Sequence, residues 1–158
     1  PRQSSDVHYE GELAVVIGRI CRDVPPEQAT DVIHGYTVAN DVTARELQAK
    51  DVQYSRAKGF DTFAPIGPCI AVGLDPSELE VEGWVNGQKR QHSNTRELIF
   101  PVPYIIEWLT RFMTLEAGDV ITTGTPSGVG PLVPGDRMMV KVAGVGALSN
   151  PCVEAPEA

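Results

Sequence analysis

A short run near the start of the chain combines two acidic side chains with an apolar stretch. Residues 7–19 read VHYEGELAVVIGR, so Glu10 and Glu12 are followed directly by LAVVI. This apolar run, rich in β-branched residues, predicts a strand over residues 10–18 that becomes buried on both faces. Side chains alternate along a strand, so Glu10 and Glu12 point to the same side. Because two like charges repel each other, the fold has to hold something positive beside them.

A third carboxylate follows the next predicted strand. The segment GYTVANDV, residues 35–42, contains the β-branched and aromatic residues that favour a strand, and Asp41 stands near its end. If the two strands are neighbours, Asp41 can approach Glu10 and Glu12. Three carboxylates supply only oxygen ligands, which favour Mg²⁺, Mn²⁺ or Ca²⁺ over zinc. A divalent cation would then offset the repulsion between the glutamates.

Other interpretations of these acids stay open at this point. A Glu-x-Glu pair is also typical of a solvated strand face, and an Asp before a helix is also typical of a helix cap. The sequence Thr43-Ala44-Arg45-Glu46 fits a capping box, which predicts a short helix over residues 44–50. His8 has the same strand parity as the two glutamates, so a mixed site of histidine and carboxylates is a further possibility.

Cationic and amide side chains follow Asp41 in the sequence. Arg45 and Gln48 lie three residues apart, so they share one face of the predicted helix. The amino-terminal end of that helix adds partial positive charge. Lys58 follows in the segment RAKGFD. We expect these three side chains to be donors to an anionic, oxygen-rich ligand on the cation, although each is also compatible with an ordinary surface position.

The rest of the chain predicts many short strands and few helices. Asn86-Gly87 between two alternating segments is the signal of a type I′ hairpin. Helical spacing predicts one substantial helix through PVPYIIEWLTRFM, and further strands are expected at residues 66–73, 119–124, 137–143 and 146–153. The chain lacks the regular alternation of strand and helix of a doubly wound sheet. We therefore predict a β-rich α+β domain, with a disordered tail at residues 154–158.

Composition narrows the possible partners and the compartment. The chain has 158 residues and a net charge of −8, which argues against nucleic-acid binding and requires a local positive site for any acidic substrate. No apolar run approaches the roughly 20 residues of a membrane helix, and no signal peptide is visible. Cys21, Cys69 and Cys152 are odd in number and widely spaced. We see no disulfide framework in them, and expect a cytoplasmic protein without a membrane partner.

Four ordered motifs carry a resemblance to a known family. The segments YEGELAVVIG, GYTVANDVTARELQ, RAKGFDTFAPIGP and ITTGTPSGVGP resemble the fumarylacetoacetate hydrolase family, over residues 7–153. The resemblance points to the branch of bacterial acylpyruvases and 2-hydroxyhepta-2,4-diene-1,7-dioate isomerases. It implies a mixed-sheet β-sandwich roll, one catalytic domain over residues 1–153, and a homodimer.

The resemblance also implies a role for each matching residue. The metal-binding E-x-E motif matches Glu10 and Glu12, and the N-D motif matches Asn40-Asp41, with Mg²⁺, Mn²⁺ or sometimes Ca²⁺ as the ion. The family arginine, glutamine and lysine match Arg45, Gln48 and Lys58, which contact the substrate oxygens and the oxyanion. The family threonine matches Thr125, which with Gly124 anchors a substrate carboxylate in a glycine-rich turn.

One departure from the family pattern concerns water activation. Hydrolytic members carry a His–Glu pair on a lid helix upstream of the E-x-E strand. The sequence begins a few residues before that strand, so we expect the lid segment to be missing here. His34 and His92 lie in the wrong motifs to replace that pair.

The resemblance implies divalent-metal-dependent hydrolysis of a C–C bond in an acylpyruvate-type 2-oxo acid, through a metal-stabilised enolate. Decarboxylation or isomerisation of a homoprotocatechuate-pathway diacid, or decarboxylation of oxaloacetate, uses the same residues and is the alternative. An alternative of another class is a non-catalytic metal-binding β-module, in which Arg45 and Lys58 would be dispensable.

Overall fold

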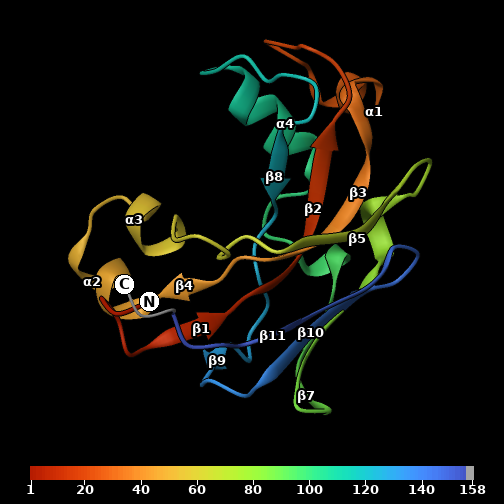
Figure 1. Ribbon diagram of the computed structural model, residues 1–158. Helices are drawn as coiled ribbons and strands as arrows, with labels where there is room; N and C mark the ends of the chain where they lie inside the picture. The colour runs from red at the N-terminus through yellow and green to blue at the C-terminus, as the bar shows by residue number, and fades with distance from the viewer. Residues whose placement is uncertain (156–158) are drawn as a thin grey trace.

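The structure is a computed structural model that describes residues 1–155, in which three sheets are flanked by short helices (Figure 1). Residues 156–158, which belong to the predicted tail, lie outside the described residues. The first two tail residues, Glu154 and Ala155, are exposed and lie outside any helix or strand.

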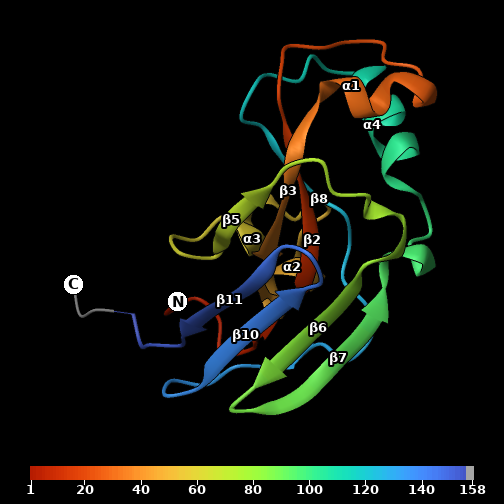
Figure 2. The same ribbon diagram turned by 90° about the vertical axis from the view of Figure 1, so that its right-hand side faces the viewer.

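The strands form two sheets of four strands and one sheet of three. In spatial order, the first sheet contains β5 (Ile66–Ala71), β3 (Ile33–Asn40), β2 (Gly11–Ile17) and β8 (Val120–Thr122). The second contains β11 (Gly146–Pro151), β10 (Arg137–Val142), β6 (Glu80–Val85) and β7 (Gln88–Asn94), side by side in Figure 2. The small sheet contains β4 (Thr43–Ala44), β1 (Val7–Tyr9) and β9 (Gly130–Pro131).

Every strand pair within the described residues is antiparallel. The β-rich α+β fold class is therefore confirmed, but the sheets are antiparallel rather than mixed. Parallel neighbours need a crossover of a dozen or more residues, whereas β6–β7 and β10–β11 are joined by tight hairpins. In the β6–β7 hairpin, Asn86 has φ 51° and Gly87 has φ 77°, the two positive values that the predicted type I′ turn requires.

The helices are short and lie at the edges of the sheets. They are α1 (Ala29–Val32), α2 (Arg45–Lys50), α3 (Ser55–Lys58) and α4 (Val102–Thr110), with 3₁₀ turns η1 (Pro26–Gln28), η2 (Pro76–Glu78) and η3 (Thr95–Glu97). The substantial helix predicted after Pro101 is α4, which ends at Thr110, so that Met113 lies beyond it and is exposed. Within residues 1–155, no helix has the length and apolar character needed to cross a membrane.

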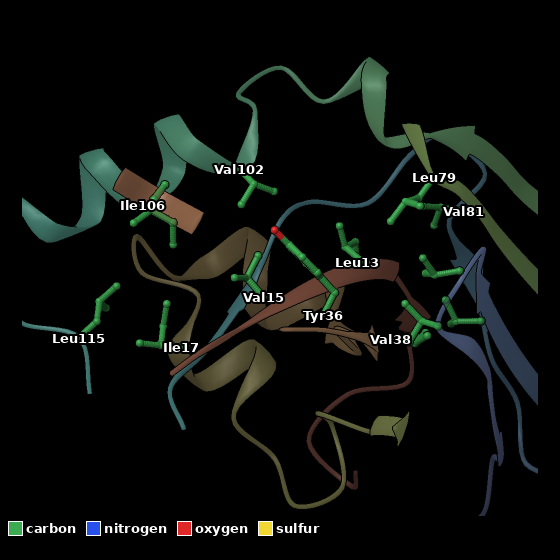
Figure 3. Packing of buried hydrophobic residues seen from close by; sticks show 14 of the residues in the cluster. Leu13, Val15, Ile17, Tyr36, Val38, Leu79, Val81, Val102, Ile106 and Leu115 are labelled. Atoms are coloured by element: carbon green, nitrogen blue, oxygen red, sulfur yellow. The ribbon is translucent and has the colours of Figure 1, made fainter. Parts of the chain in front are cut away.

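The main core lies between the two four-stranded sheets and under α4. Figure 3 shows this core, to which β2 contributes Leu13, Val15 and Ile17. Helix α4 contributes Val102 and Ile106 to the same core. All seven residues of β2 are buried, because β3 and β8 pair with its two edges and both of its faces are covered. This confirms the strand that the sequence predicts to be buried on both faces.

A smaller apolar cluster holds a side lobe that contains α2 and α3 (Figure 1). The buried members of this cluster are Val42, Ala44, Leu47, Ala57 and Phe63. Burial of these side chains fixes both helices against β4. The lobe thereby carries the side chains of Arg45, Gln48 and Lys58 to the end of the main sheet.

The predicted capping box at the start of α2 is wrong, although the helix itself is confirmed. The N-cap residue is Ala44, and no side chain caps the helix. Thr43 belongs to β4, where its hydroxyl donates to the carbonyl of Asp41. The carboxylate of Glu46 accepts from the Ser5 hydroxyl instead. The partner of Glu46 lies 41 residues away along the chain, which local sequence spacing does not reveal.

Candidate metal centre

Backbone hydrogen bonds join the entry of β2 to the end of β3. Glu10 lies directly before β2, and its N–H donates to the side-chain oxygen of Asn40 at 2.9 Å. The N–H of Asp41 donates to the carbonyl of Glu10, also at 2.9 Å. These two bonds fix the Asn40-Asp41 pair beside the Glu-x-Glu strand.

The three carboxylates that the sequence singles out come together at this junction. Glu10, Glu12 and Asp41 each offer a carboxylate oxygen, and these atoms lie within 4.8 Å of one another. Glu10 is 7% exposed and Glu12 is 2% exposed, while Asp41 is partly buried. The pair is therefore not on a solvated strand face. Asp41 does not cap α2 either, because Ala44 is the N-cap residue.

Two cationic side chains border the carboxylates. The Lys58 ammonium donates to Asp41 Oδ2 at 2.5 Å and to Glu10 Oε2 at 3.0 Å. Arg45 Nη2 lies 2.6 Å from Glu10 Oε1. Arg45 also donates through Nη1 to the side-chain oxygen of Gln48 at 2.8 Å, so these two residues share one helix face as predicted. Arg45, Gln48 and Lys58 thus lie together at one side of the acidic cluster.

The charge balance of this group leaves room for one more cation. When all are ionised, the three carboxylates exceed Arg45 and Lys58 by one negative charge. A divalent cation would turn this balance into one positive charge. Because interactions at partly buried sites are screened less than those on the surface, such a site could attract an anion despite the overall charge of −8.

Glu12 has the most perturbed carboxyl group of the three. Burial raises the pKa of Glu12 to about 7, and the charges of Asp41 and Glu10 also raise it, while the hydrogen bond from Gly124 acts in the opposite direction. The N–H of Gly124 donates to Glu12 Oε2 at 2.6 Å. The protein interior therefore disfavours a third uncompensated negative charge at this position.

These donors fit a hard divalent cation. The cluster consists of carboxylate oxygens only, and two of its members, Glu10 and Glu12, are buried. Each carboxylate oxygen has more than one acceptor position, so the bonds from Lys58 and Arg45 do not prevent Glu10 from binding an ion as well. Oxygen donors of this kind are those preferred by Mg²⁺, Mn²⁺ and Ca²⁺.

The glycine-rich loop after β8 approaches the same strand. The Thr125 hydroxyl donates to the Gly11 carbonyl at 2.9 Å, and Gly124 contacts Glu12 as described above. The structure thus brings Gly124 and Thr125 to the Glu-x-Glu segment. The Thr125 side chain is engaged with protein groups, so its predicted contact with a substrate carboxylate stays a prediction.

Sequence reasoning missed one residue of this region, Gln91 on β7. It is 1% exposed, its Oε1 accepts from the N–H of Gly11 at 3.1 Å, and its Nε2 donates to Thr125 Oγ1 at 2.8 Å. The only local signal is a glutamine in a polar run, QKRQHS, at a position that turns out to face inward. Nothing in that run distinguishes it from its exposed neighbours.

His8 is not part of the carboxylate cluster. Its Nε2 lies 2.8 Å from Asp6 Oδ1, and His8 pairs with Thr43 across β1 and β4. Within residues 1–155, the groups of side chains that could hold a metal are the cluster described above and a second set, Glu80, Glu82 and His92. In the second set, Glu82 contacts both Lys89 and Lys141. The other two members, Glu80 and His92, are exposed. Because Lys89 and Lys141 already compensate the buried Glu82, we assign this set no ion.

A cavity of about 240 Å³ lies beside the glycine-rich loop. Gly124 and Thr125 line it together with apolar side chains, among them Leu13, Leu98 and Phe100. None of the three clustered carboxylates lines this cavity. It therefore adjoins the candidate metal centre without containing it.

Comparison with known proteins identifies the family. The model of the fumarylacetoacetate (FAA) hydrolase C-terminal family matches residues 1–153. The chain belongs to the fumarylacetoacetate hydrolase family. The resemblance carried by the four sequence motifs is thereby confirmed.

Two solved structures of fumarylacetoacetate hydrolase relatives are very similar to the chain. The 2-hydroxyhepta-2,4-diene-1,7-dioate isomerase from Mycobacterium marinum is 50% identical with a TM-score of 0.97, and the match covers 99% of this chain and 62% of that chain. The maleylpyruvate hydrolase from Sphingobium sp. SYK-6, solved with manganese(II) and pyruvate, is 40% identical with a TM-score of 0.88, and the match covers 96% and 56%.

A curated relative carries a third activity in its name. Mitochondrial oxaloacetate decarboxylase from Dictyostelium discoideum is 44% identical over 151 residues, which are 92% of this chain and 69% of that protein. Members of the fumarylacetoacetate hydrolase family that resemble this chain are thus enzymes of several reaction types. The chain spans about three fifths of the length of several curated relatives.

Proposed function

We propose that the protein is a divalent-metal-dependent enzyme that breaks a C–C bond in a small 2-oxo acid, with hydrolysis of an acylpyruvate as the preferred reaction. One observation carries this proposal: three carboxylates within 4.8 Å of one another are bordered by Lys58 and Arg45. Metal ligands beside fixed cations are what an enolate-forming reaction needs.

Glu10, Glu12 and Asp41 would hold the ion, for which we propose Mg²⁺ or Mn²⁺, with Ca²⁺ as a further candidate. When bound, the ion supplies Lewis-acid polarisation of adjacent substrate oxygens and so stabilises an enolate. The manganese in the similar maleylpyruvate hydrolase structure supports this choice of ion type. The donor chemistry of the three side chains supports it independently.

Lys58 would supply fixed positive charge where the substrate oxyanion develops. Burial acts to lower the pKa of Lys58, but its hydrogen bonds and charge interactions with Asp41 and Glu10 outweigh this effect, so that its pKa is raised. These carboxylate partners favour the protonated form of the amine. Its role is electrostatic stabilisation and hydrogen-bond donation to the oxyanion.

Arg45 and Gln48 would bind the oxygens of the substrate, and Gly124 with Thr125 would anchor its carboxylate. Arg45 is oriented by Glu10 and Gln48, so its remaining donors point from a fixed position. The loop Gly124-Thr125 is held against β2 by its own hydrogen bonds. The α2 side chains and the loop approach the carboxylates from different elements. A ligand lying between α2 and the loop could therefore be held from both sides.

Oxaloacetate decarboxylation is a second candidate, supported by the relative from Dictyostelium discoideum. Isomerisation of a seven-carbon diacid is supported in the same way by the structure from Mycobacterium marinum. Both reactions need the same ligands and cations as acylpyruvate cleavage. The three reactions rely on the same residues, and the similarity to maleylpyruvate hydrolase supports the preference for hydrolysis.

A substrate panel tests the proposal. Acetylpyruvate, oxaloacetate and 2-hydroxyhepta-2,4-diene-1,7-dioate are incubated with the protein and Mg²⁺, with Mn²⁺, or with a chelator. We expect metal-dependent cleavage of acetylpyruvate. Turnover of oxaloacetate alone would reject acylpyruvate hydrolysis and establish the second candidate, and metal binding without any turnover would favour a non-catalytic module.

We also propose a homodimer and a cytoplasmic location. The family resemblance supports the dimer, and the three free cysteines are compatible with a reducing compartment. Light scattering after size exclusion separates the dimer from a monomer of 17.1 kDa.

A further inference from the structure

Gln91 is a buried amide whose hydrogen bonds connect two parts of the candidate metal centre. On one side its Oε1 accepts from the N–H of Gly11, the residue between the two glutamates, at 3.1 Å. On the other side its Nε2 donates to Thr125 Oγ1 and to the carbonyl of Pro126, both at 2.8 Å. The Gln91 side chain therefore connects β2 with the glycine-rich loop that follows β8.

Two glycines beside Gln91 leave the space that its amide occupies. A Cβ at Gly83 would lie 2.6 Å from Gln91 Oε1, and a Cβ at Gly11 would lie 3.2 Å from the same atom. The register of β6 and β7 also shifts between Gly83 and Trp84, next to the site of this side chain. Glycines on two different segments thus accommodate one glutamine, which fixes where its amide lies.

The three hydrogen bonds satisfy the amide on both sides. Gln91 has one carbonyl oxygen and two amide hydrogens, and the structure provides a donor for the oxygen and two acceptors for the nitrogen. Thr125 continues the network, because its hydroxyl donates to the carbonyl of Gly11. Gly11 is therefore linked to the loop twice. Its N–H binds Gln91, which in turn binds the loop, and its carbonyl accepts directly from Thr125.

We propose that Gln91 is a positioning residue that holds the Gly124-Thr125 loop at a fixed place relative to Glu10 and Glu12. It contacts neither the carboxylates nor a reacting atom, so it acts through Thr125 and Gly11. The inference rests on the proposed function, in which the loop binds the carboxylate of a 2-oxo acid. A loop held in place binds that carboxylate without a further entropic cost of ordering.

Steady-state kinetics of Gln91→Met with Mn²⁺ test the proposal, with the better substrate of the panel. Methionine keeps the volume and removes all three bonds. We expect KM to rise about tenfold with kcat within about threefold, because the lost interaction affects substrate binding rather than the chemical step. The matched control is Gln88→Met on the exposed part of the same strand, which should leave both constants unchanged. A merely structural role would lower the fraction of active protein, and so lower kcat, while leaving KM unchanged.

A double-mutant cycle with Thr125→Val shows whether Gln91 acts through Thr125. If it does, the double variant should raise KM no more than the larger of the two single variants. Independent, multiplying effects would overturn the proposal. If Gln91→Met fails to fold, Gln91→Glu takes its place, since it keeps the acceptor for Gly11 and loses the amide donor to the loop.

Hydrogen exchange separates this inference from the proposed function. The N–H of Gly124 should exchange about tenfold faster in Gln91→Met than in Gln88→Met, because the loop loses its anchor. This measurement needs no substrate. Absence of turnover in the wild type would remove the proposed function, whereas unchanged exchange of Gly124 would remove the positioning role.

Discussion

At the scale of single residues, Lys58 and Glu12 differ in how well the protein stabilises their charged forms. Lys58 is a partly buried cation held by Asp41 and Glu10, and its pKa is raised by these partners against the effect of burial. Glu12 is a buried acid whose pKa is raised mainly by burial. The partners of Lys58 thus favour its charged form, whereas burial disfavours the charged form of Glu12.

Replacing Lys58 separates catalysis from metal binding. We expect Lys58→Met to lower kcat at least about a hundredfold, since it removes the fixed charge beside the developing oxyanion. The dissociation constant for Mn²⁺, measured by calorimetric titration, should change less than about threefold, because the three carboxylates remain. Lys50→Met, at an exposed position on α2, is the control. Unchanged turnover would support a non-catalytic module.

Replacing Glu12 should affect the ion instead. Glu12→Gln keeps the acceptor for Gly124 and the side-chain volume but removes one ligand charge. We expect the affinity for Mn²⁺ to fall by about a hundredfold or more, a loss in keeping with the role of ligand charge in binding hard cations. With a chelator present, the melting temperature should not fall, because a buried charge is removed. Unaltered Mn²⁺ affinity would place the ion elsewhere.

At the scale of elements, the loop between β8 and β9 depends on close backbone contact. Gly128 has φ 99°, and a Cβ there would lie 2.1 Å from the carbonyl oxygen of Arg90 on β7. The Gly128 carbonyl also accepts from the Tyr9 hydroxyl at 2.8 Å. The loop is therefore held between β1 and β7 at a position that only glycine can occupy.

A comparison of Gly128 with Gly135, a glycine of nearly equal φ, isolates this contact. Gly135 has φ 96°, but a Cβ there would meet nothing within 4 Å. Gly135→Ala should lower the free energy of unfolding by about 1 kcal/mol from backbone strain alone. Gly128→Ala should cost at least about 2 kcal/mol more, because the loop has to move away from β7. Urea unfolding measures both, and equal losses would show that the loop adapts freely.

At the scale of the whole molecule, the stability of the core should respond to high pH through Tyr36. Its ring belongs to the main core together with Leu13, Val15 and Val102 (Figure 3). Burial and, to a smaller extent, the negative charge of Asp75 together raise the pKa of Tyr36 to about 12. Ionisation of this phenol is therefore coupled to unfolding.

The direction of this pH dependence follows from the pKa of Tyr36, which is lower in the unfolded chain than in the folded chain. Below pH 10.0, the ordinary pKa, both folded and unfolded chains keep the proton. As pH rises from there towards 12, the unfolded chain loses it first, so the free energy of unfolding falls by about 1.4 kcal/mol per pH unit. Between about pH 9 and about pH 11, urea unfolding should show a loss about 1 kcal/mol larger for the wild type than for Tyr36→Phe. Equal losses would mean that the folded protein ionises Tyr36 as readily as the unfolded chain.

The sequence by itself determined the local features. Unbroken apolar residues after Glu12 specify a buried strand, and the Glu-x-Glu parity places two carboxylates on one side. Asn86-Gly87 specifies the turn of the β6–β7 hairpin through its positive φ values. These depend on the chemistry of adjacent residues. The motifs around them were also sufficient to identify the family and the β-rich fold class.

Only the tertiary structure decided how distant segments meet. The convergence of Asp41 on the two glutamates was a conditional expectation until β2 and β3 were seen to pair, and sequence spacing wrongly assigned Thr43 and Glu46 to a capping box. Gln91 gave no signal at all, because its partners are 80 and 34 residues away along the chain. Such contacts depend on strand register and on packing between sheets, which nearby residues do not specify.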